Sequence, residues 1–325
     1  MSREEMPMYT VRRRSLFASA AAALAAPALA RAQGQGQRQL RIVVPYTPGG
    51  SADLMARALG ASINARSGRT VVVDNRPGAA GTIGTQAVAR SQPNGETILQ
   101  SDMGPMSIQP AAGKPGYTPG DFLPVARLVT DPIILATRTD SPFTNLAEVV
   151  RRAKADPGGV SYATPGILSH LHVATERFAQ LAGIELTHIP YQGTGPGVVA
   201  VLAGQVNLIA LPPTPLQDQS AQLRPLAVAN EAPLPELPGV PTFRDGGIDL
   251  VLQGWRGLFA PKGTPAASVA ALERSVFEAF EDGGFVEQIR KLGLTPAPLG
   301  ADAFAGFWAA DREVVSKLVS RLPKG

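Results

Sequence analysis

The chain has 325 residues, of which 44% are hydrophobic, and this is enough for one large or two medium-sized domains with buried cores. The formal net charge is +4, but the first 32 residues hold five arginines against two glutamates, so 25 basic and 24 acidic side chains remain beyond them. A nearly neutral chain lacks the basic surface that nucleic-acid binding requires, so we expect no nucleic-acid partner. The absence of cysteine excludes disulfides, thiolate metal sites and cysteine nucleophiles.

Residues 1–32 have the pattern of a cleaved export signal. Three arginines at 12–14 precede the alanine-rich stretch SLFASAAAALAAPALA, which ends in small residues suited to cleavage. The stretch is shorter than the roughly 20 residues needed to span a bilayer. We therefore expect a protein that works outside the cytoplasm, exported by the twin-arginine or the general secretory route, with a disordered linker over residues 33–37.

Beyond the linker, short apolar runs alternate with segments of helical periodicity. The predicted strands are LRIVVPY, TVVVDN, ETILQS, PIILATR, VSYAT, ELTHIPY, VNLIAL and LRPLAVA. Strands that alternate with helices predict an α/β fold of mostly parallel sheets flanked by helices.

Two long extended stretches, DPIILATRTDSPFT and LQGWRGLFAPKGTP, are candidates to carry the chain from one sheet to another and back. They predict a first domain of residues 38–135 and 258–325, a second domain of residues 136–257, and two crossing strands as the hinge. The C-terminal part is predicted to be helical, with Thr264 capping a helix that has Pro265 at its first position. Its apolar stripe predicts these core residues: Phe304, Phe307, Trp308, Val315, Leu318 and Leu322.

The stretch TPGGSAD follows the first predicted strand and opens a helix. Gly49 and Gly50 allow a ligand to approach the backbone closely, while Ser51 can cap the helix or donate a hydrogen bond. The free N–H groups and the dipole at a helix N-terminus favour a negative group. Asp53 is either a partner of this dipole or an acceptor for a ligand hydroxyl or amine.

A second glycine loop, with Gly78, Gly81, Thr82 and Gly84, follows the next strand and also opens onto a helix. The two helix N-termini are expected to converge on one point. The sequence GAAGTIG departs from G-x-G-x-x-G and neither loop has a Walker lysine, so a carboxylate is favoured over a nucleotide.

A third loop, with Thr164, Gly166 and Ser169, is expected to face the first two across a cleft. His170 and His172 raise the alternative of a metal site, but residues two apart on a helix point in different directions, so we expect no metal and no cofactor. His172 is instead expected in a polar wall or as a hydrogen-bonding core residue. The chain has neither a G-x-S-x-G nor an H-E-x-x-H motif, although a triad assembled in space stays possible.

Read together, several segments resemble the solute-binding proteins of tripartite tricarboxylate transporters, the Bug family. They are PYTPGGSADLMAR, VVVDNRPGAAGTIGTQAVA, HIPYQGTGP, LAGQVN, LRPLAV, LPGVPT, WRGLFAPKGTP and LGLTP, in the family's order. The resemblance implies a two-domain periplasmic binding protein of the Venus-flytrap type, each domain a mostly parallel sheet flanked by helices, which closes on a small carboxylate.

The resemblance also implies the ligand-binding residues. In the first domain they are Tyr46, Thr47, Gly50, Ser51, Ala52, Asp53, Gly81 and Thr82, and in the second they are Thr164, Gly166, Ser169, His172, Tyr191 and Gly193. The sequence departs from the family at Leu168, where a glycine is usual.

The expected function is periplasmic capture of a small organic acid by a monomer that delivers it to membrane permease subunits, without catalysis. Two alternatives stay open: a ligand sensor that signals to a membrane kinase, and a periplasmic hydrolase.

Overall fold

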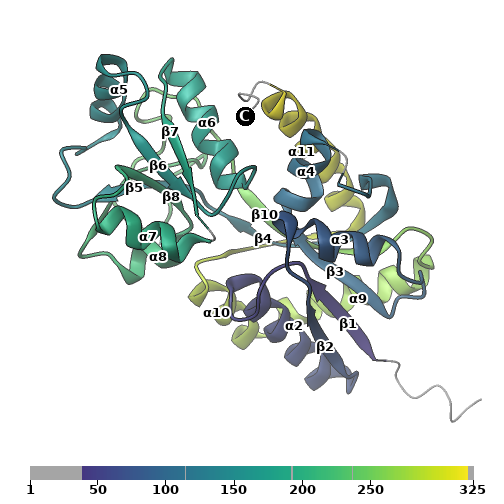
Figure 1. Ribbon diagram of the computed structural model, residues 1–325. Helices are drawn as coiled ribbons and strands as arrows, with labels where there is room; N and C mark the ends of the chain where they lie inside the picture. The colour runs from purple at the N-terminus through teal and green to yellow at the C-terminus, as the bar shows by residue number, and fades with distance from the viewer. Residues whose placement is uncertain (1–38, 114, 192, 236, 321–325) are drawn as a thin grey trace, which may run out of the picture. The chain divides into compact units, whose positions relative to one another are not determined.

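Two β-sheets organise the chain in this computed structural model, which describes residues 39–113, 115–191, 193–235 and 237–320 (Figure 1). The predicted export signal and linker lie outside the described residues. The first sheet has the strand order β11-β4-β10-β3-β1-β2 and the second has the order β7-β6-β8-β5-β9. The first sheet contains β1 (Leu40–Val44), β2 (Val71–Asn75), β3 (Thr97–Asp102), β4 (Phe122–Asp131), β10 (Gly254–Pro261) and β11 (Thr295–Gly300). The second contains β5 (Ile134–Arg138), β6 (Ser161–Thr164), β7 (Thr187–Pro190), β8 (Leu208–Leu211) and β9 (Leu223–Val228).

Both sheets are mixed, so the prediction of mostly parallel sheets is wrong. Parallel pairing occurs between β1 and its neighbours β2 and β3, and between β6 and its neighbours β7 and β8. The strands β10 and β5 pair antiparallel with both of their neighbours, and β11 pairs antiparallel with β4. The α/β class itself is confirmed, as are the eight predicted strands; β4 and β11 were not anticipated as strands.

The chain leaves and re-enters the first sheet at one point. β4 ends at Asp131 and β5 begins at Ile134, so only two residues separate the two sheets there. The return strand β10 begins at Gly254, whose register partner on β4 is Asp131. The two crossing segments are therefore hydrogen-bonded neighbours.

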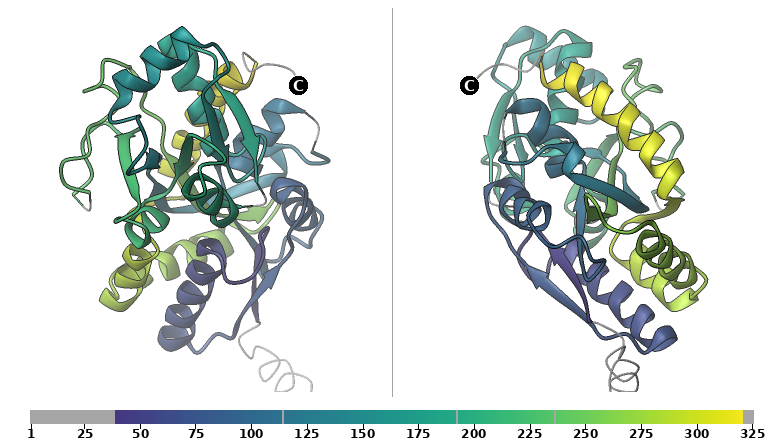
Figure 2. Two further views of the ribbon diagram at one scale, coloured as in Figure 1. Left: turned by 60° about the vertical axis from the view of Figure 1, so that its left-hand side comes forward. Right: turned by 90° about the vertical axis from the view of Figure 1, so that its right-hand side faces the viewer.

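Helices cover both faces of the first sheet. They are α2 (Ser51–Ser67), α3 (Thr82–Ala89), α4 (Gln109–Ala112), α9 (Ala266–Phe280), α10 (Gly283–Lys291) and α11 (Ala301–Val319), with short turns at Ala79–Gly81, Gly104–Ile108 and Pro119–Asp121. One face packs Ile42 and Leu258 against α2, α9 and α10, and the other packs Leu99 and Phe259 against α3 and α11. Figure 2 shows α11 in yellow at the side of the molecule and α2 in purple beside β1 and β2.

The second sheet is also covered on both faces, by α5 (Leu146–Ala155) and α6 (His170–Ala182) on one side and by α7 (Thr194–Leu202) and α8 (Pro213–Asp218) on the other (Figure 1). Alternate strand residues separate the faces: Leu135 packs with α5 and α6, and Ile134 packs with α7 and α8. This is the period of two that a strand dictates.

The predicted C-terminal core stripe is confirmed where the structure describes it. Phe304, Trp308 and Val315 are buried, and Phe307 and Leu318 pack partly buried against the same core. Leu322 lies outside the described residues. The predicted cap is wrong: Pro265 itself occupies the N-cap of α9, and the Thr264 hydroxyl donates to the Pro261 carbonyl at 2.7 Å instead.

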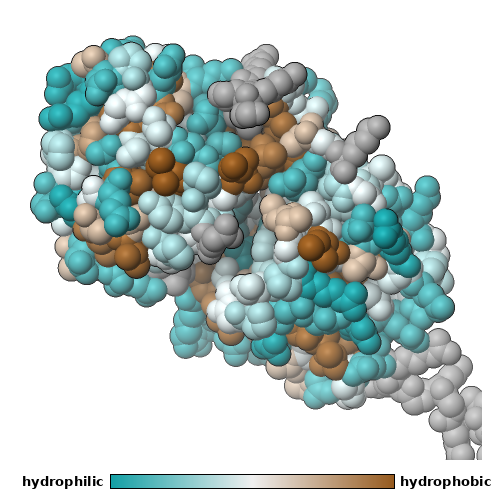
Figure 3. All heavy atoms as spheres, in the orientation of Figure 1, coloured by the Kyte–Doolittle hydropathy of each residue, from teal (hydrophilic) through white to brown (hydrophobic). Residues whose placement is uncertain are grey.

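On the face shown in Figure 3, apolar side chains form separate spots among polar ones. Exposed large apolar residues include Leu54, Val72, Ile83, Ile167, Val199, Phe277 and Val314. Within the described ranges, no helix combines the length and the apolar character needed to cross a membrane.

Candidate functional site

The N-terminus of α2 is open. Gly50 occupies the N-cap with φ −76° and ψ 166°, and no side chain caps the helix there. The first intrahelical bond runs from the Leu54 N–H to the Gly50 carbonyl at 3.0 Å, so the N–H groups of the first turn have no acceptor within the helix. Gly50 is exposed and Ser51 is half-buried. This terminus can therefore bind a negative group through its N–H groups and its dipole.

Asp53 maintains the shape of this loop. Its buried carboxylate accepts a hydrogen bond from the Gly49 N–H at 2.9 Å and from Arg57 Nε at 3.0 Å. Burial alone would raise the pKa of Asp53, but these bonds from Arg57 and Gly49 lower it. Of the two roles expected for Asp53, these contacts favour the local one, since both partners belong to the loop and its own helix.

The second glycine loop meets the first at Tyr46. Gly81 has φ +87°, and a β-carbon there would lie 2.6 Å from Pro105 Cγ and 3.4 Å from the Tyr46 hydroxyl. Gly81 is also the N-cap of α3 and has no side-chain cap, as at Gly50. The two predicted loops are thus brought together, and glycine is required at position 81 because both space and φ exclude a side chain.

The remaining first-sheet candidates differ in exposure. Thr47 is exposed, whereas Ala52 is buried and its carbonyl accepts a hydrogen bond from Gln100 Nε2 at 2.6 Å. The Thr82 hydroxyl donates to the Ala79 carbonyl at 2.9 Å, within its own turn. Of these residues, Thr47 has the side chain most accessible to a ligand.

An ion pair that sequence reasoning missed lies beside the α2 N-terminus. Asp131 Oδ2 accepts hydrogen bonds from Arg256 Nε at 2.8 Å and from Arg256 Nη2 at 2.7 Å. Arg256 Nη1 donates to Ser51 Oγ at 2.9 Å. Burial disfavours the charged guanidinium, but the nearby carboxylates of Asp131 and Asp102 raise the pKa of Arg256, so it stays charged.

Two further polar groups border this ion pair. Burial, followed by the charge of Asp102 and a hydrogen bond to it, raises the pKa of Tyr46, so its hydroxyl stays protonated and can donate. His170, the first residue of α6, lies against Gly254, where a β-carbon would be 3.0 Å from His170 Cδ2. Burial lowers the pKa of His170 more than Asp131 and Asp102 raise it, so the imidazole is neutral.

The third predicted loop contains side chains that bond to one another. The Thr164 hydroxyl lies 2.6 Å from His188 Nε2, and the imidazoles of His188 and His172 stack with centroids 4.1 Å apart. His172 Nδ1 accepts a hydrogen bond from the Leu168 N–H at 3.1 Å, which places the ring proton on Nε2. These contacts agree with the expectation that His172 is a hydrogen-bonding core residue.

Both stacked imidazoles are neutral. Burial, and for His172 also the neighbouring His188, lowers the pKa of each to about 4. The ring of Tyr162 stacks on His188, and the Tyr162 hydroxyl donates a hydrogen bond to Glu176.

The N-terminus of α6 is closed. Ser169 occupies the N-cap, and its hydroxyl oxygen accepts a hydrogen bond from the His172 N–H at 3.1 Å. Leu168 has φ +58°, the left-handed region in which glycine is usual. The preceding Gly166 has φ +143° and open space around its α-carbon.

The N-terminus of α7 follows the neighbouring parallel strand. Gly193 is its N-cap, with φ +117°, no side-chain cap and open space around it. The Tyr191 N–H donates to the Thr164 carbonyl at 2.9 Å, which ties the two loops of the second sheet together. Thr164, Tyr191 and Gly193 therefore gather at one edge of this sheet.

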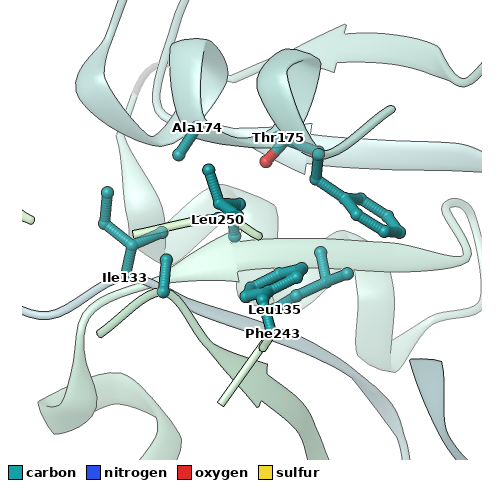
Figure 4. Close-up of a pocket in the computed structure, with 9 residues that line it drawn as sticks. Ile133, Leu135, Ala174, Thr175, Phe243 and Leu250 are labelled. Atoms are coloured by element: carbon teal, nitrogen blue, oxygen red, sulfur yellow. The ribbon is translucent and has the colours of Figure 1, made fainter. Parts of the chain in front are cut away.

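A small cavity beneath α6 does not fit a carboxylate (Figure 4). It has a volume of about 10 Å³, at the lower limit for one water molecule. Its lining consists of Ile133, Leu135, Ala174, Thr175, Phe178, Ala210, Ala229, Phe243 and Leu250. The hydroxyl of Thr175 donates to the Leu171 carbonyl at 2.8 Å, so the cavity is a packing void in the apolar core.

Among the residues that the structure describes, no group of three or more histidine or acidic side chains is arranged to hold a metal ion.

Comparisons with known proteins agree with this architecture. Residues 55–322 match the family described as the tripartite tricarboxylate transporter family receptor. The protein BugT of Bordetella pertussis is 34% identical over 278 residues, which cover 83% of this chain and 85% of BugT.

Two solved structures with bound acids are also similar. MatC from Rhodopseudomonas palustris with bound malate matches with a TM-score of 0.77 and 27% identity, over 87% of this chain and 99% of MatC. The R. palustris protein Rpa4515 with adipate matches with a TM-score of 0.79 and 28% identity, over 88% of this chain and 98% of that protein.

Proposed function

Because the chain belongs to the tripartite tricarboxylate transporter receptor family, we propose that it captures a small organic carboxylate in the periplasm and delivers it to membrane permease subunits. Malate and adipate, the acids bound by the two similar R. palustris proteins, define the expected class: short dicarboxylates.

The observation that carries this proposal is the open N-terminus of α2. It offers unbonded N–H groups, an exposed glycine and a hydroxyl at the positive end of a helix. We assign the first carboxylate of the ligand to this terminus, with Tyr46, Thr47, Gly50 and Ser51 around it. Ala52, Asp53, Gly81 and Thr82 support the two first-sheet loops in this assignment.

The second-sheet loops hold the distal end of the ligand in this proposal. Gly166 and the open N-terminus at Gly193 would approach the ligand through their backbones. Thr164, Ser169, His172 and Tyr191 would support them, because their polar groups already bond to one another within the second sheet.

The two domains of this proposal are residues 38–135 with 258–325 and residues 136–257, and ligand binding closes them. Each domain contains one of the two sheets, except that the first residues of β5 and β10 lie just across the boundary. The hinge is the pair of crossing segments where Asp131 and Gly254 face each other. Residues 1–32 act as the export signal and the exported protein works as a monomer. A receptor of this kind binds its ligand without converting it.

Calorimetric titration of the exported protein with malate, adipate and other dicarboxylates of four to six carbons tests the function. We expect at least one of them to bind with a stoichiometry of one, and small-angle scattering to show a smaller radius of gyration in the complex. Turnover of an ester or phosphate by the protein, without saturable binding of any acid, would favour the hydrolase instead.

A further inference from the structure

The Ser51 hydroxyl is held as an acceptor on one side and is free on the other. Its oxygen accepts from Arg256 Nη1, and a guanidinium has only donors, so the serine proton takes no part in this bond. Ser51 is half-buried, at the first position of α2. Its proton is therefore available to an acceptor that lies at the helix N-terminus.

The guanidinium that holds Ser51 is itself fixed. Nε and Nη2 of Arg256 both donate to Asp131 Oδ2, which leaves Nη1 aimed at Ser51. Arg256 is 8% exposed and Asp131 is 1% exposed, so water competes little for these bonds. A planar guanidinium held at one edge can present its remaining N–H groups in only one direction.

We propose that Arg256 is a positioning residue for the ligand: it turns the Ser51 hydroxyl so that the hydroxyl donates to the carboxylate at the α2 N-terminus. A hydroxyl that accepts from a cation is a stronger donor, because linked hydrogen bonds polarise one another. Asp131 orients Arg256, Arg256 orients Ser51, and Ser51 contacts the acid. This inference rests on the proposed carboxylate-binding function.

Two other roles are consistent with the same contacts. Arg256 could act only as a buried tie between β4 and β10, or it could attract the acid by its charge alone. If Arg256 only links the two strands, its substitution should change stability, and this change should not depend on Ser51. If Arg256 acts only by its charge, a lysine at position 256 should preserve the affinity for the acid. Positioning requires donors whose directions are fixed by a rigid plane, whereas lysine has a single nitrogen with rotatable donors on a flexible stem.

The experiment is a double-mutant cycle measured calorimetrically with malate and adipate. The proteins are the wild type, Ser51→Ala, Arg256→Lys and the double variant, each with its thermal unfolding recorded. Arg256→Lys keeps a positive charge beside Asp131, which limits the penalty of an unpaired buried carboxylate. Arg127→Lys is the matched control, because Arg127 is a partly buried arginine of the same sheet that donates to the Ala297 carbonyl at 2.9 Å.

We expect Ser51→Ala and Arg256→Lys each to weaken binding about tenfold, and the double variant to bind no more weakly than either single variant. Arg127→Lys should change affinity by less than about twofold, as expected for an independent site. If Arg256→Lys does not fold, the pair Asp131→Asn with Arg256→Gln replaces it in the cycle, since that pair leaves no uncompensated charge.

Additive effects of the two substitutions, or full affinity in Arg256→Lys, would overturn the positioning role while leaving the proposed function intact. A folded wild type that binds neither acid would instead overturn the proposed function, and the positioning role with it.

Discussion

The N-termini of α2 and α6 have opposite designs at corresponding places in the two sheets. Each helix follows a parallel strand, and each has a serine at or beside its cap. Ser169 accepts a hydrogen bond from the backbone of its own helix, whereas Ser51 leaves its helix uncapped and accepts from Arg256. The Ser169 cap satisfies one of the free N–H groups of α6, so of these two termini α2 retains the larger set of donors for an anion.

The most severe test of this difference is Gly50→Val. We expect binding to weaken by more than about 100-fold, because the side chain would stand where the carboxylate approaches the N–H groups. Stability should change by less than about 1 kcal/mol, since φ −76° suits any residue and an added β-carbon meets only the Thr47 carbonyl, at 3.8 Å. Calorimetry gives the affinity and circular dichroism the folded state. Wild-type affinity in the folded variant would show that the loop is only a turn.

The second test measures how the stability of the protein depends on pH through the two stacked histidines near α6. His172 and His188 have pKa values of about 4, below the ordinary 6.5. As the pH falls from 6.5 to 4, the unfolded chain binds protons that the folded protein does not, so the free energy of unfolding falls. We expect a loss on the order of 2 kcal/mol for the pair, allowing for screening by solvent.

Asp311 acts in the opposite direction, because burial raises its pKa to about 6 and its contribution is lost as the pH rises towards that value. The histidine effect is therefore obtained by comparing urea unfolding of the wild type with that of the His172→Gln/His188→Gln variant from pH 7 to pH 4.5. Parallel pH profiles in the two proteins would contradict the assignment.

The third test replaces each of the two serines, Ser169 and Ser51, by alanine and compares the effects on stability and affinity. Ser169→Ala should cost about 1 kcal/mol of stability through the lost cap, with little change in affinity. Ser51→Ala should weaken binding about tenfold, and it should also cost about 1 kcal/mol of stability because Arg256 Nη1 loses its acceptor. Calorimetry and thermal unfolding on both variants measure the two effects, and equal losses of affinity for the two serines would remove the distinction between the helices.

The smallest expected effect concerns Leu168, the non-glycine residue at φ +58° before α6. Leu168→Gly relieves a strained conformation but also loses packing and gains freedom in the unfolded chain. We expect these three effects nearly to cancel, so that the free energy of unfolding measured by chemical denaturation changes by less than about 1 kcal/mol. A larger loss would mean that packing of the leucine against the core dominates.

The sequence predicted the local features of the fold and the loops of the candidate site, but not the ion pair that lies beside them. Alternation and glycine loops predicted the eight strands and the helices that follow them, because these signals extend over a few residues. The strand β4 escaped notice, since its run contains Pro124 and Arg127 and its partners β10 and β11 lie far along the chain.

The ion pair of Arg256 and Asp131 was missed for the same reason: the two residues are 125 positions apart in the sequence. A signal was nevertheless present. A charged residue within each of two apolar runs, LVTDPIILA and GWRGLFA, is typical of a buried pair, because an isolated buried charge is costly. His172 stays a proposed ligand-binding residue; its ring also stacks on His188 and accepts from the Leu168 N–H, contacts that no spacing rule indicates.

The position of β10 between β3 and β4 has a consequence for how the chain folds. The first sheet cannot close until residues 254–261 are available, whereas the second sheet needs only strands between Ile134 and Val228. Joining distant segments costs loop-closure entropy and slows folding. We expect the second sheet to acquire protected amides first in pulse-labelled hydrogen exchange. The ion pair of Arg256 then forms beside the α2 terminus after the second sheet, so the newly made protein becomes competent to bind only once β10 has joined the first sheet.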